Sequence, residues 1–106
     1  IAPKHCQSNA HMYYILLNSL EERTRLIEEM RREGIFPVFH YVPLHSSPAG
    51  KKYARTHGEM TYTNALSDRL LRLPMWTGLE PEMDHVLSVI FDSLDDSSFQ
   101  RVANRF

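Results

Sequence analysis

The chain has 106 residues, the size of one domain, so two separate hydrophobic cores are excluded. A composition of 42% hydrophobic, 24% charged and 10% aromatic residues is that of a globular protein and argues against intrinsic disorder. Twelve Lys and Arg residues face thirteen Asp and Glu residues, and the resulting net charge of −1 disfavours a general nucleic-acid binder or a protein of anionic membrane surfaces.

The cysteine content and the first residues bear on the compartment. Cys6 is the only cysteine, which allows no internal disulfide and fits a reducing compartment, so we expect a cytoplasmic protein. No apolar run approaches the roughly 20 residues of a membrane helix, and the first residues contain no signal-peptide core. The chain begins at Ile1, which fits a piece of something larger.

The first half of the chain predicts a strand, a helix and a second strand. Residues 11–17 are apolar or aromatic on both alternating faces, as in a central strand covered on both sides. Ser19 and Glu22 have capping-box spacing, which predicts a helix over 20–33 that Gly34 ends in a left-handed conformation. The side chains expected on its buried face are Leu26, Ile27 and Met30.

A second strand is expected over 36–41, where Pro37 lacks an N–H and places the start of the segment at a sheet edge. Residues 42–61 are rich in Pro, Ser, Gly and charged side chains, which indicates a long polar loop with one helical turn near 49–55. Loops of about 20 residues are uncommon in compact domains and are often functional. Chemistry is therefore expected in this loop.

The last third predicts two further helices. Helical spacing of leucines covers 63–72 before Pro74, and residues 73–76 are expected to pair as a short edge strand. The clearest amphipathic pattern covers 81–94 and predicts a helix lying on the sheet, whereas 95–106 are expected to be frayed. The predicted fold class is thus α+β, a small three-stranded sheet with packed helices.

Six histidines are the first candidates for metal or acid–base chemistry, but none lies in H-E-x-x-H and no Cys-x-x-Cys is present. Nothing around Cys6 suggests a lowered thiol pKa, and the four glycines are too dispersed to cradle a phosphate. Metal sites, thiol catalysis and nucleotide-binding loops therefore lack their usual signatures. The histidines are His5, His11, His40, His45, His57 and His85.

The remaining candidates lie where the second strand meets the polar loop. Two imidazoles and a phenol can hold a hydroxyl-bearing substrate, and three nearby basic side chains can meet phosphate oxygens, so a sugar phosphate satisfies both groups. Spacing alone favours the alternative, in which the imidazoles and the phenol pack at the strand end and the basic side chains are solvated. The predicted substrate-binding residues are His40, Tyr41 and His45, and the possible phosphate contacts are Lys51, Lys52 and Arg55.

The same loop carries a resemblance to a known family. The segments HMYYILL, GIFPVFHYVPLHSSPAGKKYAR and LSDRLLRLPMWTGLEPEMDHV resemble the C-terminal region of the DegT/DnrJ/EryC1/StrS aminotransferases. The resemblance extends from about residue 2 to residue 89. It implies that the chain is the small C-terminal α+β domain of a fold-type I enzyme. In that domain His40 faces the sugar, His45 matches the second histidine of the same loop, and Tyr41 lies beside them.

The resemblance also implies a reaction and partners. In the intact homodimeric enzyme, pyridoxal phosphate (PLP) is aminated by glutamate and then aminates the 4-keto group of a dTDP-4-keto-6-deoxyhexose, a step of surface-polysaccharide biosynthesis. The Schiff-base lysine belongs to the large N-terminal domain. None of that domain's motifs is present here, so we expect this chain to bind no PLP and to be inactive alone.

Two other classes of protein stay open on the residues alone. A non-enzymatic sensing or dimerisation domain has the same pattern of elements and would show an exposed apolar patch without a cleft. A metal-dependent hydrolase requires His40, His45 and His57 to converge. The role of His57 is otherwise undetermined.

Overall fold

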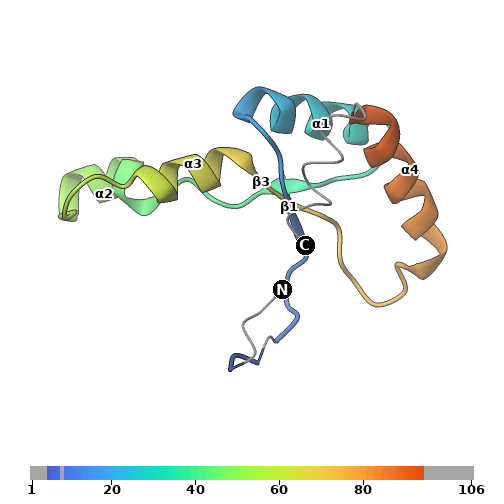
Figure 1. Cartoon of the computed structure of the whole chain (residues 1–106), viewed down its shortest axis with the longest axis horizontal. Helices are drawn as coiled ribbons and strands as arrows, with labels where there is room; N and C mark the ends of the chain where they lie inside the picture. Colours follow the sequence, from blue (N-terminus) through green and yellow to red (C-terminus); the bar gives the residue numbers. More distant parts are fainter. Residues whose placement is uncertain (1–4, 8, 95–106) are drawn as a thin grey trace.

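The computed structural model describes residues 5–7 and 9–94, and the tail predicted to be frayed, 95–106, lies outside this range. Within it the α+β class is confirmed, because one sheet is formed by strands that are separated along the chain by helices (Figure 1). The elements are β1 (Tyr14–Leu16), α1 (Leu20–Arg32), β2 (Val38–Phe39), η1 (Leu44–Ser46), α2 (Pro48–Tyr53), α3 (Thr61–Arg69), β3 (Leu70–Arg72), η2 (Glu80–Glu82) and α4 (Met83–Ser93).

The three strands pair antiparallel in the order β1-β3-β2. The expected central strand at 11–17 is therefore wrong in its position, because β1 is an edge strand and β3 lies in the middle. The prediction that other elements cover both faces of this strand is also wrong, since Tyr13 and Tyr14 are exposed. The edge position predicted from Pro37 is confirmed by β2, which pairs only with β3.

The third strand lies at Leu70–Arg72, so the strand expected over 73–76 and the helical end expected at 70–72 are both wrong. Helix α3 stops at Arg69 because the following residues pair with two strands far away in the sequence. The fully buried Leu71 faces Ile15 on one side and Phe39 on the other. Long-range pairing has overridden a helical leucine spacing.

Helix α1 has the predicted ends. The Ser19 hydroxyl accepts a 3.2 Å hydrogen bond from the Glu22 N–H, and the Glu22 carboxylate accepts from the N–H of Asn18, one residue before the cap. At the other end Gly34 has φ +77°, and the Ile35 N–H donates to the Met30 carbonyl in a Schellman motif. Local chemistry therefore fixes both boundaries of this helix.

The core lies between α1, α4 and the sheet. Helix α4, with η2 before it, confirms the helix expected at 81–94, and it packs mainly against α1 (Figure 1). Burying these side chains is the main stabilising term, since each contributes about 1.5–3 kcal/mol. The buried core residues are Leu17, Leu26, Ile27, Met30, Ile35, Leu71, Val86, Ile90 and Leu94.

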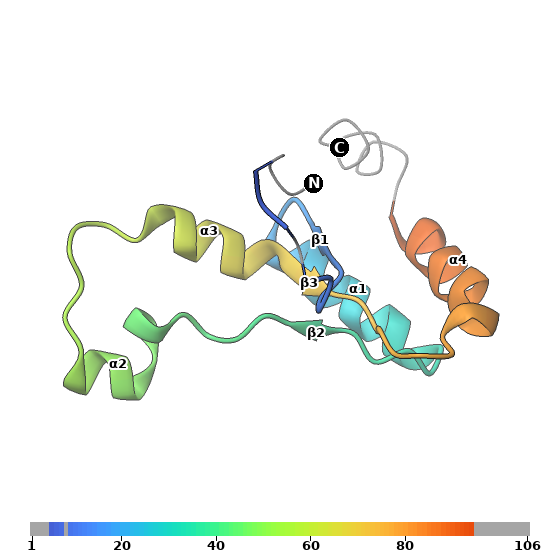
Figure 2. The same ribbon diagram turned by 90° about the horizontal axis from the view of Figure 1, so that it is seen from below.

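Residues 40–69, from the end of β2 to the end of α3, form an arm that projects away from the core (Figure 2). The expected long loop is thus more regular than predicted, since it contains η1 and the two-turn helix α2. Neither α2 nor α3 has a buried residue, so the helix expected at 63–72 does not pack on the sheet over most of its length. Within the described range no helix is long and apolar enough to cross a bilayer.

Candidate functional site

A pocket of about 270 Å³ lies where the arm leaves the core, between β2, the segment from Tyr41 to the end of η1, α1 and α3. We call it the arm-base pocket. It combines an aromatic wall with a guanidinium, a carboxylate, an amide and two hydroxyls, which suits a polar organic ligand. Its lining residues are Arg23, Phe39, Tyr41, Val42, Pro43, Ser46, Asn64, Ser67 and Asp68.

Tyr41 lines this pocket, and its backbone has an unusual conformation. Its φ of +43° is left-handed, a region that non-glycine residues seldom adopt, and the side chain is 72% exposed. Such strain of about 1–3 kcal/mol persists where surrounding structure imposes it, often at binding sites. The turn ends β2 and directs the chain into the arm.

His40 does not line the arm-base pocket but lies directly beside Tyr41, which does, with ring centroids 5.2 Å apart in an edge-to-face arrangement. The Nδ1 atom of His40 is buried and has no hydrogen-bond partner. Buried polar atoms are rarely left without one. This nitrogen is therefore suited to a partner supplied by a ligand or by another part of a larger protein.

His45 reaches the same pocket through a second residue. Its Nε2 lies 2.8 Å from the Oδ1 of Asn64, and Asn64 lines the pocket from α3. Because an amide oxygen only accepts, Nε2 is the protonated nitrogen in this contact. The pair ties η1 to α3 across the arm, so His45 positions the pocket wall and does not itself line the pocket.

Arg23 is a site residue that sequence reasoning missed. Its guanidinium lies 5.4 Å from the centroid of the Phe39 ring and donates a 2.6 Å hydrogen bond to the Ser67 carbonyl, while Nε is buried without a partner. It thus joins α1, β2 and α3 at the pocket. The available signal was its spacing, since Arg23 precedes Leu26 and Ile27 by three and four residues and so shares the buried face of the helix.

The basic residues of the arm are not brought to this pocket. Lys51 and Lys52 lie on α2 and Arg55 follows it, all exposed and outside the pocket lining. The ammonium of Lys52 instead lies 4.9 Å from the centroid of the Tyr53 ring. Their predicted phosphate contacts stay predictions, as does any role for His57, which is exposed between α2 and α3.

The described residues do not fit the anchor that PLP requires. A lysine that forms a Schiff base at neutral pH is held in a desolvated or cationic pocket that lowers its amine pKa. Lys51 and Lys52 are the lysines within residues 5–7 and 9–94, and both are exposed. Over the same range no three His, Cys, Asp or Glu side chains are grouped to hold a metal ion, as the hydrolase alternative requires.

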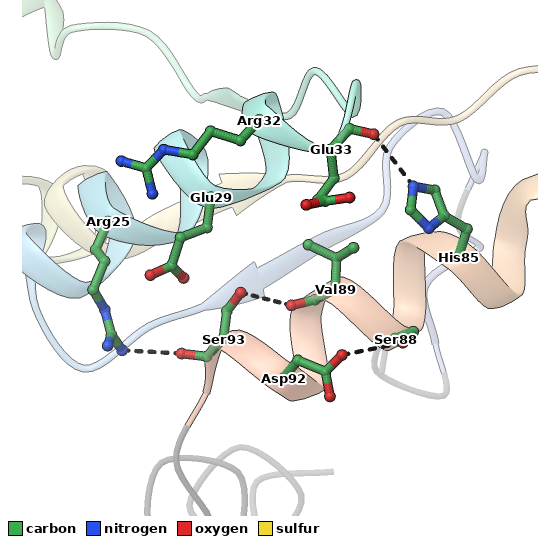
Figure 3. Close-up of a pocket in the computed structure, with 9 residues that line it drawn as sticks. All are labelled: Arg25, Glu29, Arg32, Glu33, His85, Ser88, Val89, Asp92 and Ser93. Carbon is green, nitrogen blue, oxygen red and sulfur yellow. Dashed lines mark hydrogen bonds between the residues drawn. The ribbon is translucent and has the colours of Figure 1, made fainter.

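A larger pocket, of about 510 Å³, lies elsewhere, in the groove between α1 and α4 (Figure 3). Its side chains serve mainly to join the two helices. Arg25 donates to the Ser93 carbonyl at 3.0 Å, and the His85 ring lies 3.2 Å from the Glu33 carbonyl at the end of α1.

Comparisons with known proteins agree with this fold. The profile of the DegT/DnrJ/EryC1/StrS aminotransferase family matches residues 1–91. The chain is similar to the uncharacterized protein MJ1066 of Methanocaldococcus jannaschii, with 29% identity over 82% of this chain and 23% of that protein. It is also similar to Spr1654 of Streptococcus pneumoniae, assigned as a sugar aminotransferase and solved in its PMP form, with a TM-score of 0.61 and 27% identity over 82% of this chain and 24% of that one. The chain thus spans about a quarter of the length of these relatives.

Proposed function

Because this chain belongs to the DegT/DnrJ/EryC1/StrS aminotransferase family, we propose that it forms the substrate-contacting C-terminal domain of a PLP-dependent sugar transaminase. The observation that carries the proposal is the arm-base pocket, which gathers hydrogen-bonding groups from α1, from the segment after β2 and from α3 at one point. The reaction we propose for the whole enzyme moves an amino group from glutamate to the 4-keto group of a dTDP-4-keto-6-deoxyhexose. Among such enzymes, dTDP-4-amino-4,6-dideoxygalactose transaminase is the one we favour.

In this proposal the residues of this chain bind and orient the sugar. The Tyr41 hydroxyl donates to or accepts from sugar hydroxyls, and so does the imidazole of His40, which lies beside Tyr41 but does not itself line the pocket. The Asn64 amide, held by His45, lines the same pocket from α3. When bound, PLP supplies the electron sink for amino transfer. The cofactor is held by the large domain of the same protein and not by this chain.

The exposed apolar surface around the pocket supports a larger partner. Four apolar side chains lie close together in the sequence at the end of β2 and the start of the arm, and Phe39, Tyr41, Val42 and Leu44 are between 47% and 83% exposed. A soluble domain seldom leaves such a stretch in water, so we propose that the large domain, within a homodimer, covers it. A sensing or dimerisation domain explains this exposed apolar surface as well, but it does not account for the polar side chains of the adjoining arm-base pocket.

The test uses the longer protein that carries this chain. Glutamate alone is expected to convert the cofactor, as seen by its absorbance, and a dTDP-4-keto-6-deoxyhexose is then expected to return the absorbance and yield the amino sugar by mass spectrometry. The UDP-linked keto-sugar is the control for nucleotide preference. Amino transfer to a small keto acid without any transfer to the keto-sugar would refute the proposal.

A second arm of the test uses the chain by itself. Titration of PLP into the 106-residue chain is expected to give only the absorbance of the free aldehyde, because its described lysines are exposed. A stoichiometric adduct at one lysine, trapped by borohydride, contradicts the assignment of the cofactor to the large domain.

A further inference from the structure

A third pocket differs in its chemistry from the two already described. It has a volume of about 350 Å³ and lies between the C-terminus of α1 and the segment from β3 to α4. Its floor includes the buried Ile35 and Val86, and its wall includes Phe36, Pro74 and Trp76. We call it the Trp76 pocket. It shares no lining residue with the arm-base pocket.

The aromatic side chains of this pocket are unusually exposed. Phe36 is 71% and Trp76 is 55% exposed, although each offers a large apolar surface that would ordinarily be covered. Neither belongs to a strand or a helix, so their positions follow from the chain entering and leaving the sheet. The pocket thus presents two ring systems to an incoming group.

The charge around these rings is negative. Glu82 lines the pocket, and from residue 73 to residue 94 the sequence contains Glu80, Glu82, Asp84 and Asp92 but no Lys or Arg. His85 is the one basic side chain of the lining, and its ring nitrogen Nε2 lies 3.2 Å from the Glu33 carbonyl. Glu33 also lines the pocket, although its carboxylate extends toward Val89 in the neighbouring groove (Figure 3). An anionic ligand is therefore disfavoured, and a purely apolar one leaves the carboxylate of Glu82 unused.

We propose that the Trp76 pocket binds an alkylguanidinium group, with the cation against the Trp76 and Phe36 rings and beside the Glu82 carboxylate. A guanidinium is planar, stacks on aromatic faces and is weakly hydrated, so it suits this combination better than a compact ammonium. The volume admits a side chain of this size with its alkyl stem on Ile35 and Val86. An arginine side chain of a partner polypeptide and a free guanidine metabolite share this chemistry.

The test uses the fact that Trp76 is the only tryptophan of the chain. In ¹⁵N-labelled chain its indole N–H gives a single NMR cross-peak, which reports on this pocket alone. Addition of n-butylguanidinium chloride at constant ionic strength is expected to shift this peak saturably. The uncharged and nearly isosteric n-butylurea is the matched ligand control, and it is expected to leave the peak in place.

Two acidic residues of the same turn give a matched pair of variants. Glu82→Gln is expected to weaken n-butylguanidinium binding by about two- to fivefold, the effect of losing one exposed ion pair. Glu80→Gln removes the same charge from η2 but not from the pocket lining, and is expected to leave the affinity nearly unchanged. Phe36→Leu keeps an apolar wall without the ring and is expected to weaken binding to a similar degree as Glu82→Gln.

The proposal is overturned if n-butylurea shifts the peak as n-butylguanidinium does, since the pocket is then merely apolar. Equal effects of Glu80→Gln and Glu82→Gln overturn it as well, since general surface charge then explains the binding. A capped Gly-Arg-Gly tripeptide separates the two sources. Binding tighter than that of n-butylguanidinium supports a polypeptide partner, and weaker binding supports a free guanidine.

Discussion

The side chain of His45 lies 2.8 Å from the amide oxygen of Asn64, and this contact closes the arm between η1 and α3. No residue of either element is buried, so packing contributes little to holding them together. A single exposed hydrogen bond is worth about 0.5–1.5 kcal/mol, which is enough to bias the position of the Asn64 wall of the arm-base pocket.

We therefore predict that His45 and Asn64 act as one unit on the sugar. In the whole protein, His45→Ala and Asn64→Ala are each expected to lower kcat/KM for the keto-sugar by about 2- to 13-fold, the equivalent of one hydrogen bond. The double variant is expected to have a kcat/KM no lower than that of the more impaired single variant, because both substitutions remove the same contact. Additive losses measured by steady-state kinetics would show that the two residues act separately.

The central position of β3 gives a prediction about stability. Leu71 is fully buried between both edge strands, so Leu71→Ala is expected to lower the free energy of unfolding by about 2–5 kcal/mol. Leu66→Ala is the matched control on α3, where the side chain is 44% exposed, and it is expected to change stability by less than about 0.5 kcal/mol. Urea unfolding of the chain checks both values. Equal losses would place Leu71 outside the core.

The difference between these two leucines also shows what the sequence could and could not predict. Leu66, Leu70 and Leu73 have helical spacing, and nothing nearby indicates that the helix ends at Arg69. The strand that follows exists because it pairs with segments about 30 and 60 residues earlier, which a local pattern does not record. By contrast Ser19 and Gly34 act within their own turns, so both ends of α1 were predicted closely.

The candidate site divides in the same way. Tyr41 was predicted because it follows a strand and opens a polar loop, and the structure does bring it to the arm-base pocket. Arg23 was missed because it lies 16 residues before Phe39 and 44 before Ser67, and only the folded chain joins them. Lys51, Lys52 and Arg55 follow the site in sequence, but the projecting arm carries them past it.

A close approach in the arm gives a third prediction. A Cβ at position 50 would lie 1.6 Å from the carbonyl oxygen of Leu44, so Gly50 permits η1 and α2 to pack together. Gly50→Ala is expected to displace η1 and, through His45, the arm-base pocket. The resulting loss in kcat/KM for the keto-sugar is expected to exceed that of Asn64→Ala. Gly58→Ala, at a position without a neighbour within 4 Å but with φ +66°, is the control for backbone strain alone.

The start of α1 gives a prediction about pH. Hydrogen bonds from the backbone N–H of Glu21, and to a smaller extent from the Ser19 hydroxyl, hold the pKa of the Glu21 carboxyl below its ordinary value of 4.5. A lowered folded-state pKa means that this stabilisation is complete above pH 4.5 and is lost as the pH falls through the lower folded-state value. Ser19→Ala is expected to raise the pKa only part of the way, since the larger cause is the backbone N–H.

An NMR titration of the Glu21 side chain checks this expectation. Ser19→Ala is also expected to lower the free energy of unfolding by about 1 kcal/mol through loss of the helix cap, whereas Ser19→Thr keeps the hydroxyl and both effects stay small. A Glu21 pKa that does not respond to Ser19→Ala would show that the hydroxyl bonds only to the Glu22 N–H.

The last prediction concerns His40, whose buried and unpartnered Nδ1 lies beside Tyr41 at the start of the arm. If this nitrogen bonds to the sugar, His40→Ala in the whole protein removes one hydrogen bond worth about 0.5–1.5 kcal/mol, or up to about 3 kcal/mol with a charged group. The expected loss in kcat/KM for the keto-sugar is then about 2- to 150-fold. The glutamate half-reaction is expected to be nearly unchanged, because the sugar is absent from it. His57→Ala, at an exposed histidine of the same arm, is the matched control and is expected to affect neither half-reaction. A purely structural His40 would instead lower the melting temperature and slow both half-reactions together, so an equal loss in both refutes the substrate role.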